Sequence, residues 1–202
     1  HQHRDEPFDD FARQPLLPNR LSQLGPGVAW FDLDGDGRDE LIIPSGKGGK
    51  LAIYRNDPQK GLQSLESPAL NPPVARDQTT ALGWTSSPGK NSLLIGSANY
   101  EEGSTNGEAV ARLDFADGNL NSVAGLPSQI ASVGPLALAD IDADGRLELF
   151  VGSRVIPGRY PEAASSHIYR YDGQRWQFEA SNSRVLESVG LVSGAVWSDL
   201  DG

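Results

Sequence analysis

Short apolar runs separated by polar turns occur throughout the chain, and no stretch shows long helical periodicity. Glycine and proline are frequent, with 23 and 14 of 202 residues, which is above average usage. The runs that we expect to form strands lie at 27–31, 40–43, 51–54 and 62–65, then at 81–84 and 93–97, and then at 136–139, 147–151, 167–171 and 176–179. Asp172-Gly173 is a strong hairpin signal between the last two runs. The pattern predicts an all-β fold of four-stranded antiparallel units.

Two of these units share an acidic loop between their first two strands. The motif is Asp-X-Asp-X-Asp-Gly-X-X-Glu, and an apolar run follows it at once. The first copy comprises Asp32, Asp34, Asp36, Gly37, Arg38 and Glu40, the second comprises Asp140, Asp142, Asp144, Gly145, Arg146 and Glu148, and a third copy opens at Asp199 and Asp201. The four carboxylates of each full copy lie within nine residues and repel one another, and a hard divalent cation removes that cost.

The spacing favours Ca²⁺ as that cation. Carboxylates at positions one, three, five and nine of a tight loop suit an ion that accepts about six to eight oxygens in flexible geometry. We expect the position-six glycine to allow a sharp bend where a Cβ would clash, and the backbone carbonyl of Arg38 or Arg146 to face the ion. An EF-hand closes with glutamate at position twelve between two helices, whereas that position here is Ile43 or Val151 and both flanks are extended. Mg²⁺ and a metal-free solvated turn are the alternatives.

The acidic loops recur with the period of a structural repeat. Asp32 and Asp140 lie 108 positions apart, about two units of 54. A degenerate unit lies between them, and its polar turn at 85–92 has no carboxylates. Phe11 to Asp34 also matches Phe178 to Asp201 at several positions with a constant offset of 167. Periods of about 40–50 residues with several short strands are typical of β-propellers, so we expect each unit to be a blade.

The loop motif resembles the calcium-binding FG-GAP and VCBS-type β-propeller repeats. Segments 25–37, 151–161 and 168–173 are similar to secreted bacterial relatives of cartilage acidic protein. The resemblance covers the chain from about Phe8 and implies a calcium-stabilised propeller outside the cytoplasm, in a mostly non-catalytic family. The ligand-free second loop and the incomplete fourth unit depart from the family pattern.

About three and a half blades are expected in this chain. Closed propellers contain about four to eight blades, so we expect a piece of a larger propeller whose open blade edges allow self-assembly or capping. The predicted divisions are an outer strand and lead-in at 1–26, a calcium-loop blade at 27–79, a degenerate blade at 80–132, a second calcium-loop blade at 133–193 and the first strand of a truncated blade at 194–202.

Composition narrows the partners and the location. The formal net charge is −10, from 17 basic and 27 acidic residues, which argues against binding nucleic acid or anionic membranes. No apolar run reaches about 18 residues, so no membrane insertion is expected. The chain has no cysteine and therefore no disulfide. Calcium loops suit an extracellular or periplasmic, secreted protein, with Ca²⁺ at two complete sites and one truncated site.

Tryptophans give a prediction about the core. Trp30, Trp84 and Trp197 appear at matching points of the first strands, and we expect them to pack between blades, not to form a sugar-stacking platform. Trp176 lies on an outer strand and is expected to be partly exposed.

No catalytic constellation is evident in the sequence. There is no thiol nucleophile, no Gly-X-Ser-X-Gly elbow and no His-Glu-X-X-His motif. We therefore expect a non-catalytic adhesion module that binds a protein or carbohydrate ligand through the irregular segments 98–108 and 154–166. A structural subunit of an extracellular filament or matrix, and a propeller-based polysaccharide lyase or hydrolase, are the alternatives.

Overall fold

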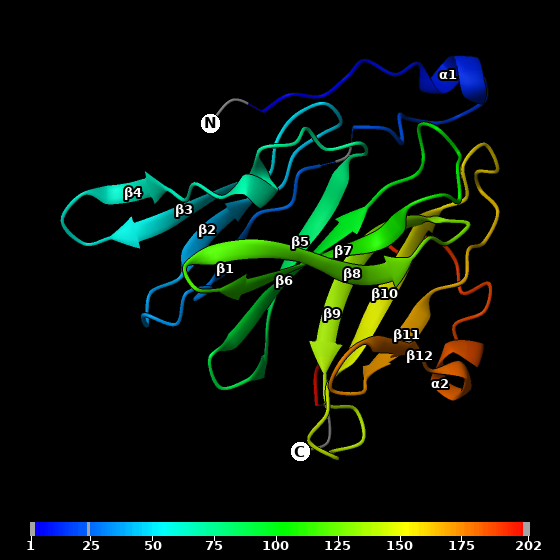
Figure 1. Cartoon of the computed structure of the whole chain (residues 1–202). Helices are drawn as coiled ribbons and strands as arrows, with labels where there is room; N and C mark the ends of the chain where they lie inside the picture. The colour runs from blue at the N-terminus through cyan, green and yellow to red at the C-terminus, as the bar shows by residue number, and fades with distance from the viewer. Residues whose placement is uncertain (1–2, 24, 200–202) are drawn as a thin grey trace.

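The computed structural model describes residues 3–23 and 25–199, and β-strands dominate this part of the chain (Figure 1). The strands of the described residues form three four-stranded antiparallel sheets, each a meander in which consecutive strands pair. The first sheet contains β1 (Ala29–Phe31), β2 (Glu40–Ile43), β3 (Ala52–Asp57) and β4 (Gly61–Ser64); the second contains β5 (Gln78–Ser87), β6 (Lys90–Ser97), β7 (Glu108–Ala116) and β8 (Asn119–Pro127); the third contains β9 (Ser132–Ala139), β10 (Glu148–Val155), β11 (His167–Tyr171) and β12 (Trp176–Phe178). The predicted all-β class is confirmed.

Helical structure is limited to short segments. Within residues 3–23 and 25–199 they are α1 (Asp10–Arg13), α2 (Ala180–Arg184) and a 3-10 turn at Pro68–Leu70. The described residues contain no helix with the length and apolar content that a membrane span requires.

The second sheet lies between the other two and is buried on both faces. Strand β1 lies beside β5, and β5 lies beside β9, so the first strands of the three sheets are neighbours. One apolar cluster fills the space between the first and second sheets, and another fills the space between the second and third. Side chains alternate along β6, so Leu93 and Ile95 enter the first cluster while Leu94 enters the second. This two-sided burial explains why residues 93–96 of β6 form a continuous apolar run.

A glycine allows the closest approach between the first two sheets. A Cβ on Gly83 of β5 would lie 2.0 Å from Cγ of Phe31 on β1, so only glycine leaves room for that ring. The aromatic ring of Phe31 therefore packs directly on the backbone of the neighbouring sheet.

The N-terminal lead-in differs from the prediction. The described residues of 8–24 form α1 and turns, not an outer strand. Asp9 caps α1 by accepting hydrogen bonds from the N–H groups of Phe11 and Ala12. Buried Asp10 accepts hydrogen bonds from the N–H groups of Leu21 and Ser22, which folds the segment back on itself. These local side-chain bonds replace the strand ladder.

The strand predicted at 194–202 is also not formed in the described part of that segment, 194–199. Residues 191–199 have no regular secondary structure, although they follow the third sheet. A strand at the edge of a new sheet has no partner to complete its hydrogen bonds, so an isolated first strand lacks the ladder that would define it.

Tryptophan burial differs from the prediction at three of the four positions. Trp84 is buried as predicted, with 3% exposed, but Trp30 and Trp197 are 53% and 38% exposed. Trp176, predicted to be partly exposed, is 8% exposed because its ring packs against Trp84, with 4.9 Å between centroids. The expectation that all three first-strand indoles are buried is therefore wrong.

Trp30 and Trp84 lie on opposite faces of their sheets. Ala29 and Phe31 pack toward the second sheet, so Trp30 between them points away from it. Trp84 instead points from the second sheet toward the third. The assumed match between the two tryptophans is shifted by one residue, and a shift of one residue moves a strand side chain to the other face.

Replacing Trp84 by alanine should lower the free energy of unfolding by about 3–5 kcal/mol, because the indole fills the space between two sheets. Trp30→Ala is the matched control and should change it by about 0.5 kcal/mol or less, because that indole is exposed. Urea unfolding of the two variants measures both effects. Equal losses would contradict the placement of the two indoles on opposite faces.

Candidate metal centre

The first acidic loop is organised by its own backbone around Asp32. The N–H groups of Gly35 and Asp36 donate hydrogen bonds to Asp32 Oδ1 at 2.8 and 3.0 Å, and that of Gly37 donates to Oδ2 at 2.9 Å. Carboxylate oxygens of Asp32, Asp34 and Asp36 lie within 4.8 Å of one another. The residues predicted at positions one, three and five therefore converge.

Asp140 organises the second acidic loop in the same way. The N–H of Asp144 donates a hydrogen bond to Asp140 Oδ1 at 3.0 Å. The converging group differs, because here oxygens of Asp140, Asp142 and Glu148 lie within 4.8 Å of one another. Asp144 instead accepts a hydrogen bond from the N–H of Arg146 at 2.8 Å, which holds the pKa of its carboxyl below the ordinary value.

The closing glutamates are buried beneath the loops. Glu40 is 2% exposed and Glu148 is fully buried. The N–H of Leu33 donates to Glu40 Oε2 at 2.8 Å, and the N–H of Ile141 donates to Glu148 Oε2 at 3.0 Å. Burial raises the pKa of Glu40 although the hydrogen bond from Leu33 opposes it. Each glutamate thus fastens its loop to the following strand, at the cost of placing a carboxylate out of water.

Two arginines missed by the sequence analysis bring positive charge to the loops. Arg55 of β3 places its Nε 3.1 Å from Asp34 Oδ2. Arg170 of β11 forms ion pairs with three carboxylates of the second loop: Asp142 Oδ2 at 2.5 Å, Asp144 Oδ2 at 3.3 Å and Glu148 Oε1 at 2.8 Å. The tripeptide Ile-Tyr-Arg ends at Arg55 and again at Arg170, and this repeat was the signal that could have found them.

For Arg38, Arg146, Asp199 and Asp201, the other predicted ligands, the structure does not show a ligand arrangement. The side chains of Arg38 and Arg146 lie 2.5 and 3.0 Å from Asp36 and Asp144 of their own loops. The role of their backbone carbonyls as ligands stays a prediction. The third copy of the motif cannot be described, because Asp201 lies outside the described residues, although Asp199 lies within them.

Backbone conformation explains the glycine at position six. Gly37 and Gly145 both have φ of +84°, and nothing lies within 4 Å of a Cβ built at either position. The expected Cβ clash is therefore wrong, and the left-handed φ is what favours glycine. The loops differ at position four, where Gly35 has φ of +76° and Ala143 has φ of +56°. An alanine in this conformation costs about 1–2 kcal/mol.

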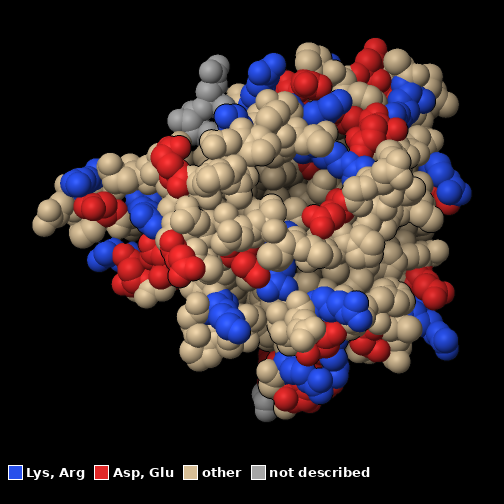
Figure 2. All heavy atoms as spheres, viewed as in Figure 1, with Lys and Arg blue, Asp and Glu red and all other residues tan. Residues whose placement is uncertain are grey.

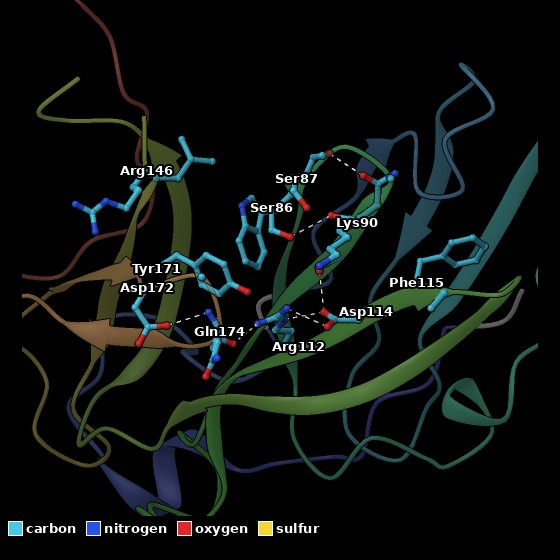
Figure 3. A pocket seen from close by; sticks show the side chains of 18 of the residues that line it. Ser86, Ser87, Lys90, Arg112, Asp114, Phe115, Arg146, Tyr171, Asp172 and Gln174 are labelled. Atoms are coloured by element: carbon cyan, nitrogen blue, oxygen red, sulfur yellow. Dashed lines mark hydrogen bonds and ion pairs between the residues drawn. The ribbon is translucent and has the colours of Figure 1, made fainter. Parts of the chain in front are cut away.

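A cleft lies beside the tight hairpin that replaces an acidic loop in the second sheet (Figure 3). It encloses about 860 Å³ between the second and third sheets. Its walls come from the β5–β6 hairpin, the end of β7, the second acidic loop and the β11–β12 hairpin. The degenerate unit thus leaves a hollow at the end of the molecule that carries the metal-ligand candidates.

An arginine held in place by its neighbours lines this cleft. Arg112 donates from Nε and Nη2 to Asp114 Oδ1 and Oδ2 at 2.6 and 2.9 Å. Its guanidinium lies 5.1 Å from the ring centroid of Trp84 and 5.4 Å from that of Tyr171. Burial lowers the pKa of Arg112, but hydrogen bonds to Asp114 and Tyr171 outweigh burial and raise it above the ordinary value. The cleft therefore combines a fixed cation with aromatic and hydroxyl-bearing walls.

The two irregular segments predicted as recognition surfaces lie at the opposite end of the sheets, near α1 (Figure 1). Tyr100 is only 2% exposed, and its backbone oxygen accepts a hydrogen bond from the Arg13 guanidinium. It is therefore packed against the N-terminal segment and unavailable to a ligand. Arg159 and Glu162 of the second segment stay exposed and pair with each other at 2.6 Å.

No protein-family model and no curated protein matches this chain. The resemblance to FG-GAP and VCBS-type repeats therefore stays a prediction from the sequence.

The φ values at position four predict opposite effects of two substitutions. Ala143→Gly should raise the free energy of unfolding by about 1 kcal/mol, and Gly35→Ala should lower it by about the same amount. Chemical unfolding with the metal chelated measures both. Gly194→Ala is the control, because Gly194 has an ordinary φ and open space around its Cβ position. If Gly35→Ala is as well tolerated as this control, the loop conformation described here is wrong.

Proposed function

We propose that this chain is a set of consecutive calcium-stabilised β-propeller blades of the FG-GAP/VCBS type, which serve as a non-catalytic extracellular binding module. The observation that carries the proposal is the convergence of carboxylate oxygens within 4.8 Å in both acidic loops, over a buried glutamate in each. Carboxylates held this closely by their own backbone suit a hard cation with flexible oxygen coordination.

Equivalent residues in the sheets support the blade arrangement. The pairing of Glu40 with Phe31, and of Glu148 with Ala139, aligns the first and third sheets and makes Trp30 equivalent to Leu138. Leu138 packs toward the preceding, second sheet. By the same geometry Trp30 points to where a preceding blade would lie, which accounts for its exposure.

The face of the third sheet that points away from the second sheet also supports the blade arrangement. Phe150 is equivalent to the buried Ile42, which faces the following sheet in the first unit. Phe150 lines an apolar groove, and the ring of Trp197 lies edge-on to it at 6.4 Å between centroids. Trp197 is the counterpart of Trp30 at the constant offset of 167 positions, so it contacts the preceding sheet as a blade residue would. Further blades, or copies of this chain in an assembly, would cover such faces.

Calcium in the two loops would act on stability. A bound cation would neutralise the negative charges of the buried glutamates and the crowded aspartates. The unfolded chain does not bring these carboxylates together, so the cation would bind the folded state more tightly and stabilise it. A ligand at about 100 times its Kd adds about 2.7 kcal/mol to stability. Extracellular calcium is high enough for weak loops to fill, which favours a secreted or periplasmic protein.

Chelation should lower the melting temperature, and Asp34→Asn and Asp142→Asn should each remove part of the calcium-dependent rise. Asp39→Asn is the matched control, because Asp39 is an exposed carboxylate of the first loop outside the ligand set. Differential scanning calorimetry with Ca²⁺ or EDTA measures the effect. Anomalous scattering should place ions in both acidic loops and none at 85–92. A melting curve unaffected by EDTA, or equal losses in Asp34→Asn and Asp39→Asn, would refute the proposal.

The ligand that we propose for this module is a carbohydrate bound in the cleft between the second and third sheets. A volume of about 860 Å³ is within the range of small-molecule sites. The side chains of Lys90, Gln174 and Asp172 extend around the opening (Figure 3), where they can form hydrogen bonds with sugar hydroxyls. Acidic and basic groups are interspersed on the face seen in Figure 2, so the surface there offers no broad charged patch for a polyelectrolyte.

Lys90→Ala and Gln174→Ala should each weaken glycan binding about fivefold to tenfold, the loss expected for one hydrogen bond of about 1–1.5 kcal/mol. Lys60→Ala is the control, because Lys60 lies in the exposed β3–β4 turn outside the cleft. A glycan array followed by titration of the bound sugar measures the affinities. Binding that survives both cleft variants would refute this site, and turnover of the bound polysaccharide would favour an enzyme over a binding module.

A further inference from the structure

A third group of carboxylates converges at the end of the molecule opposite the acidic loops. Asp5 of the N-terminal segment, Asp77 just before β5 and Glu101 of the β6–β7 connection place carboxylate oxygens within 4.8 Å of one another. These residues belong to no repeat motif and are widely separated in the sequence. Only the fold brings them together.

Two oxygens of this group are buried without a hydrogen-bond partner. The side chain of Glu101 is 7% exposed, and neither its Oε1 nor Asp5 Oδ1 has a partner. Asp77 is equally buried, and it accepts hydrogen bonds from the N–H groups of Lys47 at 2.9 Å and Gln23 at 3.3 Å. Buried polar atoms are almost always paired, and a group of anionic oxygens left unpaired points to an unseen cation.

The nearby positive charge does not balance the three carboxylates. Lys47 Nζ lies 3.9 Å from Glu101 Oε2 and 3.4 Å from Glu6 Oε2, so its charge is shared between two partners. Burial, followed by the charge of Asp77, raises the pKa of Asp5 to about 6. Burial, followed by the charges of Asp77 and Asp5, raises the pKa of Glu101 to about 7.

The backbone encloses the group closely. A Cβ on Gly46 would lie 2.4 Å from Cγ of Asp5, and one on Gly49 would lie 2.9 Å from the backbone oxygen of Arg4. The N-terminal segment is therefore seated directly on the β2–β3 connection. Ligands from separate segments give irregular geometry, which Ca²⁺ tolerates better than Mg²⁺ does.

We propose that Asp5, Asp77 and Glu101 bind a divalent cation, with Ca²⁺ as the best fit, which fastens the N-terminal segment to the first and second sheets. The site is independent of the acidic loops, since it shares no residue with them. Its effect would be local: the ion links Asp5 to two residues of the sheet connections, so it protects the N-terminal segment from opening.

Calcium titration of the metal-free full chain, by calorimetry and native mass spectrometry, should show one ion fewer per chain in Glu101→Gln and in Asp77→Asn than in the wild type. Glu102→Gln is the matched control, because that adjacent glutamate is exposed and pairs with Arg76 instead. In hydrogen–deuterium exchange, added Ca²⁺ should slow exchange of the peptide covering residues 3–9 at least about fivefold in the wild type, and this protection should be lost in Glu101→Gln.

Glu101→Gln keeps the shape of the side chain, and Asp77→Asn keeps one acceptor oxygen, so circular dichroism and the melting curve show whether each variant folds. An unchanged number of bound ions in both folded variants would overturn the proposal. A second result would also overturn it: in the absence of metal, Glu101→Gln melts at a higher temperature than the wild type, and Ca²⁺ does not slow exchange of the N-terminal peptide. That result would mean that the carboxylates share a proton and bind no cation. Loss of ions in Asp34→Asn or Asp142→Asn alone tests the acidic loops and leaves this site unaffected.

Discussion

Burial of the second sheet on both faces is the constraint on which the rest of the structure depends. Among the described residues, the first and third sheets share no apolar cluster; each packs on one side of β5–β8. Alternation along β6 divides neighbouring residues, such as Leu93 and Leu94, between the two cores. Strict alternation of strand side chains gives the second sheet two apolar faces. Packing on both faces places the first strands of all three sheets beside one another. The loops between first and second strands therefore lie at one end of the molecule.

The acidic loops lie at that end of the molecule, and each places several carboxylates close together. Backbone N–H groups that point at Asp32 and Asp140 shape the loops before any ion is considered. Glu40 and Glu148 then fasten each loop to the following strand from a buried position. The third strand supplies Arg55 or Arg170 as a counter-charge. Arg170 pairs with three carboxylates and Arg55 with one, so the arginine of the third strand contacts more carboxylates in the second loop than in the first.

The two ends of the sheets have different physical roles. The end with the acidic loops also carries the cleft around Arg112, where the degenerate unit leaves space that an acidic loop occupies in the other sheets. The opposite end is covered by the N-terminal segment, which Arg13 ties to Tyr100 and which delivers Asp5 to the third carboxylate group. The proposed carbohydrate site and the proposed N-terminal cation site therefore lie at opposite ends of the strands.

The repeat pattern was sufficient to predict the strands on either side of each acidic loop, because alternation of side chains is a short-range rule, but it did not locate β7 and β8 of the second sheet. Alternating apolar runs define strands, and the spacing of aspartates around a left-handed glycine such as Gly37 defines the loop. The face on which each tryptophan lies could not be predicted, because a shift of one residue reverses it and only strand pairing shows that Trp30 and Trp84 are not equivalent. The lead-in was also missed, since the hydrogen bonds of Asp9 and Asp10 select a helix and turns over a strand.

Sequence by itself determined the all-β class, the four-stranded antiparallel units and the position of the two acidic loops between the first two strands of their sheets. Tertiary structure alone decided which groups meet across segments: Arg170 with the second loop, Arg112 between Trp84 and Tyr171, and Asp5 with Asp77 and Glu101. The physical reason is the separation of the contacting residues along the sequence. Contacts within a loop follow from local backbone geometry, whereas contacts between distant segments exist only once the sheets have packed and the chain entropy of bringing those segments together has been overcome.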